Sequence, residues 1–261
     1  MKSSKPVAVV TGAARGIGKG CALELARAGF NLLINDRPDD ESVMKLAQVS
    51  QECQAEGAEV ECFPADVADL SQHEAMLNAA QNRWNRLDCL LNNAGISVKR
   101  RGDLLDLQPD SFDENIMVNT RAPFFLSQAF SKRLLAQPAD EHQHRSIIFV
   151  SSINAVMLAM NRGEYTMAKT AVSAAARLFA ARLCEAQIGV YEVRPGLIKT
   201  DMTIPATAYY DDLIANGLVP QGRWGYPEDI ASTVRAMAEG KLIYTCGLPV
   251  AIDGGLSMQR F

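Results

Sequence analysis

The sequence lacks the features that nucleic-acid-binding, membrane-spanning and secreted proteins need. Its 261 residues carry 26 basic and 30 acidic side chains, a net charge of −4, so there is no basic excess to neutralise phosphates. No apolar run approaches the roughly 18 residues that cross a bilayer. Residues 1–6 lead straight into a strand-like segment without a signal sequence. We expect a cytoplasmic protein that binds neither nucleic acid nor membrane.

Cysteine and histidine are also sparse. The six cysteines are scattered singly, without a C-x-x-C pair, which is typical of free thiols in a reducing compartment. Of the three histidines, only His142 and His144 are close together, and no cysteine or third histidine nearby completes a metal site. We therefore expect no bound metal.

What the sequence does contain is an alternation of short apolar segments with helical ones. Strands are predicted at residues 7–11, 31–35, 59–63, 87–91, 146–150, 190–193 and 248–252. Helices are predicted at residues 16–28, 39–55, 71–85, 110–136 and 164–186, with a shorter one after Pro227. This alternation predicts a doubly wound α/β domain whose parallel sheet is covered on both faces. With no repeat and no linker, residues 1–261 are expected to form a single dinucleotide-binding and catalytic domain.

The irregular segment 200–225 contains Pro205 and Pro220 and leaves two readings open. It is either an ordinary surface loop or a mobile lid over a site. Its place after the catalytic motifs favours a substrate lid. The apolar side chains Met202, Ile204, Tyr209, Tyr210 and Leu213 in it suggest a partly apolar substrate, or a role in packing or at a subunit interface.

The first predicted strand ends in a glycine-rich turn, Thr11–Gly18, that leads into a helix. Gly12, Gly16 and Gly18 let the backbone turn tightly and approach a ligand, and the helix N-terminus offers free N–H groups to a pyrophosphate. The second strand then ends at Asp36, where a carboxylate can accept hydrogen bonds from an adenosine ribose. This order predicts a bound dinucleotide.

The choice between NAD and NADP depends on charge. Asp36 would lie against a 2′-phosphate, and two like charges about 4 Å apart cost roughly 4 kcal/mol at an effective dielectric constant near 20. Arg15 and Arg37 act in the opposite direction, because a guanidinium pairs with phosphate. We favour NAD and keep NADP as the alternative.

Tyr165 and Lys169 stand four residues apart, which places a phenol and an ammonium on one helix face. A nearby lysine stabilises a phenolate, so the pair can exchange a proton with a substrate oxygen. The pair alone is also compatible with an ordinary surface helix. Ser151 and Ser152 end a buried strand upstream, where a hydroxyl can hold a carbonyl oxygen or cap a turn.

Taken together, the motifs resemble those of the short-chain dehydrogenases/reductases over essentially the whole chain. These are T-G-x-x-x-G-I-G at 11–18, Asp66-Val67, N-N-A-G at 92–95, Asn119, Ser152, Y-x-x-x-K at 165–169, Pro195-Gly196, Ile198, Thr200 and Asp253-Gly254-Gly255. The resemblance implies a seven-stranded sheet in the order 3-2-1-4-5-6-7. It also implies a homotetramer, for which the helical faces around Ala171, Ala174, Ala175 and Phe179 are suited.

The resemblance also implies roles for individual residues. Tyr165 is the expected general acid/base, Ser152 polarises the carbonyl, Lys169 holds the nicotinamide ribose and tunes Tyr165, and Asn119 holds a water next to Lys169. The expected cofactor-binding residues are Gly12, Arg15, Gly16, Ile17, Gly18, Asp36, Arg37, Asp66, Val67, Asn93, Ala94, Gly95, Tyr165, Lys169, Pro195, Gly196, Ile198 and Thr200. Arg162 and Glu164 are expected at the mouth of the pocket.

Within the family, the chain is similar to bacterial 3-ketoacyl-carrier-protein reductases. We expect hydride transfer between a nicotinamide cofactor and a secondary alcohol or ketone, with a 3-oxoacyl thioester as one candidate. Two positions differ from the fatty-acid-synthesis members: Asp36 favours NAD, and Ala186 stands where they carry a basic residue for the carrier protein, although Lys132 and Arg133 remain as a partial basic patch. The alternatives are a catabolic NAD-dependent dehydrogenase of a small polyol, sugar or hydroxy acid, and a non-catalytic dinucleotide sensor.

Overall fold

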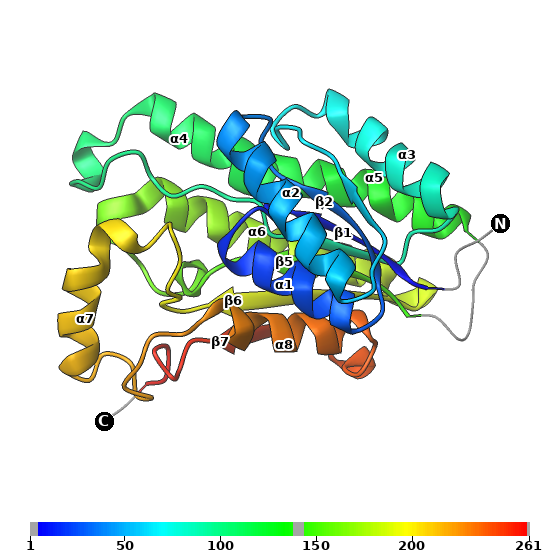
Figure 1. Ribbon diagram of the computed structural model, residues 1–261. Coiled ribbons are helices and arrows are strands. Elements are labelled where there is room, and N and C mark those ends of the chain that lie inside the picture. The colour runs from blue at the N-terminus through cyan, green and yellow to red at the C-terminus, as the bar shows by residue number, and fades with distance from the viewer. Residues whose placement is uncertain (1–4, 138–143, 260–261) are drawn as a thin grey trace.

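The computed structural model describes residues 5–137 and 144–259. Its centre is a seven-stranded parallel sheet in the order β3-β2-β1-β4-β5-β6-β7, as expected (Figure 1). The strands are β1 (Val7–Thr11), β2 (Asn31–Asn35), β3 (Val60–Cys62), β4 (Cys89–Asn92), β5 (Arg145–Val150), β6 (Ile188–Pro195) and β7 (Pro249–Ile252). Each falls on a predicted apolar segment: β1 and β2 have the predicted bounds, and the other strands differ from theirs at one or both ends by at most two residues.

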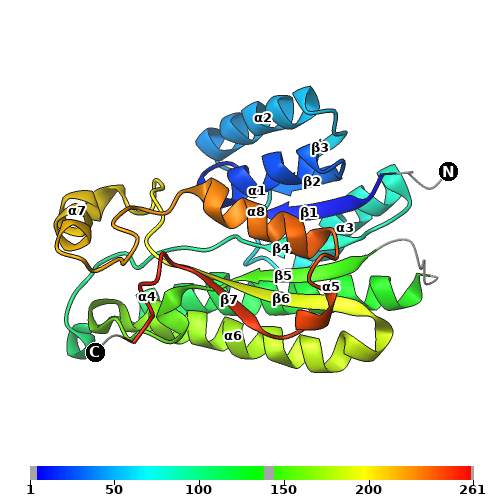
Figure 2. The same cartoon turned by 90° about the horizontal axis from the view of Figure 1, so that it is seen from below.

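Helices connect the strands and cover both faces of the sheet. They are α1 (Gly16–Arg27), α2 (Asp40–Ala55), α3 (Ser71–Trp84), α4 (Pro109–Ile116), α5 (Ala122–Ala136), α6 (Gly163–Leu183), α7 (Thr207–Ala215) and α8 (Pro227–Ala238). Helices α1, α2 and α8 lie on one face, and α3, α5 and α6 on the other (Figure 2).

The buried core is divided between the two faces by strand alternation. In β1, Ala8 and Val10 pack toward α1 and α8, whereas Val7 and Val9 pack toward α3 and α5. Every side chain of β1 and β2 is buried, and apart from the polar residues at their ends these strands are apolar throughout, as expected for strands covered on both faces. Packing on both faces holds the strands of the sheet in place. Their carboxyl ends lie along one edge of the sheet, and this is the edge at which ligands bind in folds of this kind.

Two predicted elements are wrong in detail. The single helix expected over 110–136 is divided, because residues Met117–Arg121 form a π-helical turn between α4 and α5. The segment 200–225 is not irregular throughout, since it contains α7, whose Tyr210 and Ile214 pack with Val219 and Trp224 in a small separate cluster. Apolar spacing alone does not reveal a single inserted residue in a helix turn or a helix as short as α7.

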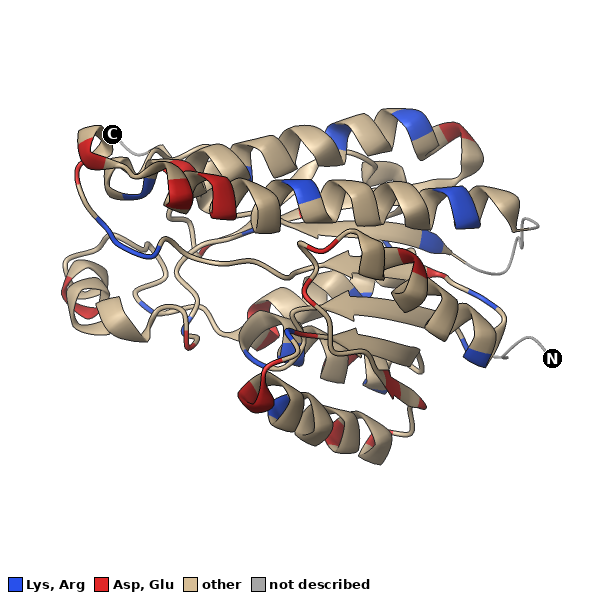
Figure 3. Ribbon diagram, turned by 90° about the horizontal axis from the view of Figure 1, so that it is seen from above, with Lys and Arg blue, Asp and Glu red and all other residues tan. Residues whose placement is uncertain are grey.

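Acidic and basic residues are interspersed along the outer helices (Figure 3). Many form pairs, such as Arg133 with Glu74 and Arg235 with Glu24. Within residues 5–137 and 144–259, no helix combines the length and the apolar character needed to cross a membrane. No cluster of three potential metal ligands occurs in that part of the chain, and His142 lies outside it.

Candidate active site

A cleft of about 560 Å³ opens at the carboxyl edge of the sheet. It brings together the glycine turn after β1, the ends of β2, β4, β5 and β6, the start of α6 and part of segment 200–225. The cleft is lined by polar and apolar side chains in similar measure, and its location matches the crevice where doubly wound sheets bind dinucleotides. The site is thus built from segments that are far apart in sequence.

The glycine turn cannot accept larger residues at two positions. A Cβ on Gly18 would lie 2.0 Å from the Gly12 carbonyl oxygen, and one on Gly12, whose φ is +65°, would lie 2.8 Å from Ala94 Cα. Asn93 holds this packing, because its Nδ2 donates to the carbonyl oxygens of Thr11 and Gly12. The turn leaves the N-terminus of α1 facing the cleft without a side-chain cap. Its free N–H groups fit the pyrophosphate of a dinucleotide.

Asp36 follows the end of β2 and lines the cleft beside this turn. Its Oδ2 accepts a hydrogen bond from Ala14 N at 2.9 Å, and its Oδ1 accepts one from Arg37 N, also at 2.9 Å. The carboxylate is therefore held in a defined orientation by the backbone. A ribose at this position would meet the carboxylate, and a 2′-phosphate would meet its negative charge.

The two arginines near Asp36 already have carboxylate neighbours. Arg15 lies 3.8 Å from Asp201, and Arg37 lies 3.4 Å from Asp39. Asp201 also pairs with Lys45 of α2, at 3.7 Å. Each of these pairs is well exposed to solvent, so each is weak. Their combined effect is nevertheless to reduce the positive charge available to an added phosphate.

Tyr165 lies on the first turn of α6, and its hydroxyl is near that of Ser152, which lies two residues after the end of β5. Burial raises the pKa of the Tyr165 phenol, while a hydrogen bond with Ser152 and the charge of Arg162 lower it. Ser152 is itself fixed, because its Oγ accepts a hydrogen bond from Asn154 N at 3.1 Å. The arrangement presents two hydroxyl groups to the same point of the cleft, which suits a carbonyl oxygen.

Lys169 is one turn further along α6 and is buried. Its Nζ donates to the Val150 carbonyl oxygen at 3.1 Å and lies 5.7 Å from the centre of the Tyr165 ring. Because burial disfavours the ammonium form, the pKa of Lys169 is lowered to about 8. The lysine therefore brings a positive charge next to the tyrosine at neutral pH.

Asn119 lies in the π-helical turn and does not line the cleft. Its amide pairs with both backbone groups of Ile96, at 2.9 and 3.0 Å, and also donates to Asn115. A Cβ placed on Gly95 would lie 2.7 Å from Asn119 Oδ1 and 3.3 Å from Lys169 Nζ. Asn119 and Lys169 therefore converge on Gly95 from two helical segments.

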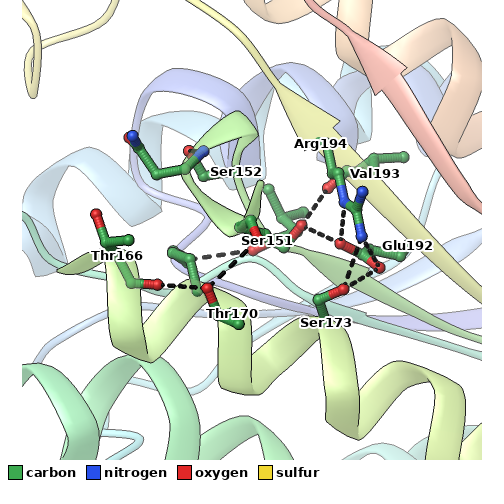
Figure 4. Close-up of polar contacts among 12 residues, drawn as sticks. Ser151, Ser152, Thr166, Thr170, Ser173, Glu192, Val193 and Arg194 are labelled. Carbon is green, nitrogen blue, oxygen red and sulfur yellow. Dashed lines mark hydrogen bonds and ion pairs between the residues drawn. The ribbon is translucent and has the colours of Figure 1, made fainter. Parts of the chain in front are cut away.

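A buried polar network supports the end of β5 from below (Figure 4). Glu192 of β6, which is 1% exposed, accepts hydrogen bonds from Ser151 Oγ at 2.6 Å and Ser173 Oγ at 2.9 Å. Arg194 donates to the same carboxylate at 2.7 Å and to Ser173 at 2.8 Å. These bonds connect β5, β6 and α6 immediately behind Ser152, and sequence analysis did not identify them.

Segment 200–225 contributes Thr200, Asp201, Met202, Thr203 and Tyr210 to the cleft. Ile204 and Tyr209 are largely exposed, and Leu213 packs into the cluster around Trp224. Opposite Tyr210 is Arg101, in the loop after β4, whose Nη1 lies 3.4 Å from Tyr210 Oη. Arg101 was missed, although the basic run 99–101 that follows N-N-A-G offered a signal.

The structure brings almost all predicted site residues to this one cleft. Every expected cofactor-binding residue lines it, as do Ser152, Tyr165 and Lys169. Asn119 lies behind it, next to Gly95. Arg162 lines the cleft as predicted, but Glu164 does not. Glu164 is buried on the far side of α6, where Ser111 of α4 donates to it at 2.7 Å.

Comparison with known proteins defines the class to which this fold and cleft belong. Residues 12–257 match a family model described as enoyl-(acyl carrier protein) reductase. The chain belongs to the short-chain dehydrogenases/reductases, and it is an oxidoreductase that transfers a hydride between a nicotinamide cofactor and a secondary alcohol or ketone.

Three relatives within the family are similar to this chain over almost its whole length. The 3-oxoacyl-[acyl-carrier-protein] reductase FabG of Staphylococcus aureus is 33% identical over 260 residues, covering 99% of this chain and 100% of that protein. A 3-oxoacyl-[acyl-carrier protein] reductase structure from Brucella melitensis, in complex with NAD, is 42% identical over the full length of both chains, with a TM-score of 0.94. A structure from Agrobacterium tumefaciens with bound NADP is 29% identical, covering 99% and 98% of the two chains, with a TM-score of 0.84.

Proposed function

We propose that this protein reduces 3-oxoacyl thioesters with NADH, with Tyr165 as the proton donor. The observation that carries this proposal is the convergence of Ser152, Tyr165 and Lys169 in the cleft that the glycine turn opens. The Staphylococcus aureus and Brucella melitensis relatives are named as 3-oxoacyl-[acyl-carrier-protein] reductases, and the exposed apolar side chains Leu158 and Met160 near the start of α6 suit an acyl chain.

The residues present fit a dinucleotide, as the glycine turn, the uncapped α1 and Asp36 indicate. The expected cofactor-binding residues, Tyr165 and Lys169 among them, would hold it along the cleft. When bound, the reduced nicotinamide supplies the hydride that adds to the carbonyl carbon. Preference for NAD over NADP is supported by Asp36 and by the carboxylates that already accompany Arg15 and Arg37.

The protein side of the reaction is a proton transfer to the substrate oxygen. Ser152 and Tyr165 donate hydrogen bonds to the ketone oxygen, which polarises the carbonyl bond. As negative charge develops on that oxygen, Tyr165 gives up its proton and the product is the alcohol. The ammonium of Lys169 stabilises the phenolate that remains, and Asn119 is a positioning residue that holds the loop at Ile96 beside this lysine.

Two further expectations belong to this proposal. A homotetramer is supported by exposed apolar side chains on the outer surface of α5 and α6, among them Phe125, Met167 and Leu178. Ala175 and Phe179, which sequence analysis placed on that face, pack largely inside the protein. Light scattering distinguishes a tetramer from a monomer. The cytoplasmic location stays a prediction.

Recognition of a carrier protein would need free basic side chains on the surface. Arg133, one of the basic residues considered for it, is bound to Glu74 and Asn78 of α3. We therefore propose that the thioester itself is the recognised part, and small thioesters serve as test substrates.

The test is NADH oxidation with the N-acetylcysteamine thioester of acetoacetate. We expect Tyr165→Phe to lower kcat by about 10²- to 10⁴-fold, the usual contribution of a general acid, a larger effect than its effect on the Kd for NADH. Tyr244→Phe is the matched control, since Tyr244 is fully exposed and does not line the cleft. Retention of most of the turnover in Tyr165→Phe would show that the assignment is wrong.

A further inference from the structure

Two arginines line the cleft without a carboxylate partner among the described residues. They are Arg101, in the loop after β4, and Arg162, immediately before α6. The other cationic residues of the cleft that lie outside the catalytic group, Arg15 and Arg37, face Asp201 and Asp39. Glu114, an acidic residue that also lines the cleft, is paired with Lys99 at 2.8 Å.

Both arginines lie at the end of the cleft where the reaction is proposed. The Arg162 guanidinium is 5.8 Å from the centre of the Tyr165 ring, and that of Arg101 is 5.9 Å from the centre of the Tyr210 ring. The Nε of Arg162 is buried and has no hydrogen-bond partner. Because a buried donor without a partner is costly, its presence at a binding site points to a ligand that supplies the acceptor.

We propose that Arg162, assisted by Arg101, binds a carboxylate of the substrate next to the ketone that Tyr165 protonates. This inference rests on the ketone reduction of the proposed function and specifies the substrate as an acidic 3-oxo compound, either a free acid or a thioester. A guanidinium forms two parallel hydrogen bonds with a carboxylate, which fixes the orientation of the substrate as well as its charge. A neutral acyl chain would leave both guanidinium groups unpaired in the cleft.

The carboxylate has two chemical sources. It is the acid group of a free 3-oxo acid, or it is the far end of a 3-oxoacyl thioester made from a dicarboxylic acid. Acetoacetate and methyl acetoacetate test the first source, since they share the ketone and differ in the charge. The N-acetylcysteamine thioesters of 3-oxoadipate and 3-oxohexanoate test the second, since they share the chain length and differ only at the far end.

The experiment measures kcat and KM for NADH oxidation with these four ketones. In at least one of the two pairs of ketones, we expect the wild-type protein to have a higher kcat/KM for the member with the carboxylate than for its neutral partner. Arg162→Met should lower kcat/KM for that member by roughly 10- to 100-fold, as expected for a lost hydrogen bond between charged groups, with little effect on the neutral member. Arg162→Lys should recover part of the loss, because it keeps the charge but not the planar geometry.

Arg100→Met is the matched control, because Arg100 is exposed next to Arg101 and does not line the cleft. Unchanged NADH affinity in every variant shows that the fold and the cofactor site are intact. If the neutral members are reduced as well as the charged ones, or if Arg162→Met lowers both equally, the carboxylate site is wrong and the ketone reductase stands. If none of the four ketones oxidises NADH, the proposed function fails and the inference fails with it.

Discussion

Lys169 Nζ donates to the Val150 carbonyl oxygen across 3.1 Å while lying 5.7 Å from the centre of the Tyr165 ring. One ammonium group thus fixes the end of β5 relative to α6 and places its charge beside the phenol. Lys169 is buried, and because burial disfavours its charged form, its pKa is lowered to about 8. Activity and stability are both expected to depend on the proton it carries.

The rate of ketone reduction should fall as pH rises through about 8. Lys169 loses its charge in this range, whereas burial keeps the pKa of Tyr165 above its ordinary value of 10 and the phenol stays protonated. The measurement is kcat/KM for the acetoacetyl thioester from pH 6 to 10 in the free enzyme. Lys132→Met, a change at an exposed lysine of α5, should give the same profile. A rate that stays level up to pH 9.5 would contradict the role of Lys169.

Lys169→Met should abolish most of the activity and yet stabilise the protein at pH 7. A pKa lowered from 10.5 to about 8 corresponds to a cost of about 3 kcal/mol for burying the charged lysine. Between pH 8 and 10.5 the unfolded chain binds more protons than the folded one, so wild-type stability rises with pH and the advantage of the variant shrinks. Urea unfolding at pH 7 and pH 10.5 measures both values. A variant less stable than the wild type at pH 7 would overturn this expectation.

Asp36→Asn should reduce the preference for NADH. The amide keeps the shape of the carboxylate and an oxygen that accepts from Ala14 or Arg37, but it removes the charge that repels a 2′-phosphate. We expect the wild type to bind NADH at least about tenfold more tightly than NADPH, a difference of roughly 1.4 kcal/mol, and the variant to lose most of that ratio. Energy transfer from protein to bound nicotinamide gives both Kd values. Equal ratios in the two proteins would mean that other residues determine the preference.

Glu192→Gln should destabilise the protein by about 3 kcal/mol, as expected when one member of a buried ion pair is removed. The Arg194 side chain is 15% exposed and would keep its charge without the carboxylate. Urea unfolding at pH 7 measures the loss. Glu41→Gln, which breaks an exposed pair with Lys45 on α2, is the control and should leave the unfolding midpoint unchanged. A midpoint equally insensitive to Glu192→Gln would show that the network does not hold β5, β6 and α6 together.

The strands and helices could be predicted because that information is local, whereas the order of the strands followed from the resemblance to the short-chain dehydrogenases/reductases. Unbroken apolar segments such as 147–150 are read directly as buried strands, and the glycine turn at 12–18 constrains the strand and helix on either side of it. The residues lining the cleft follow from motifs whose spacing is preserved on single elements, as with Tyr165 and Lys169 on α6.

The contacts that were missed join residues distant in sequence. Ser151 and Glu192 are 41 residues apart, and Arg101 and Tyr210 are 109 apart, so no periodicity connects them. Glu164 was misplaced for a related reason. Its position next to Tyr165 suggested the cleft, but successive residues of a helix point about 100° apart, and Glu164 faces α4 instead.

The π-helical turn at Met117–Arg121 changes how the two helices that it joins, α4 and α5, are rotated about their common axis. An extra residue in one turn shifts the phase of everything beyond it, so the face that α4 presents is not continued along α5. Deleting one residue there would restore regular winding and rotate the two halves against each other. Asn119 would then leave Ile96 and Gly95, and the helix would become more regular while the loop beside Lys169 lost its anchor. The π-helical turn thus sets the rotation between α4 and α5, so that each helix presents its own face to its neighbours.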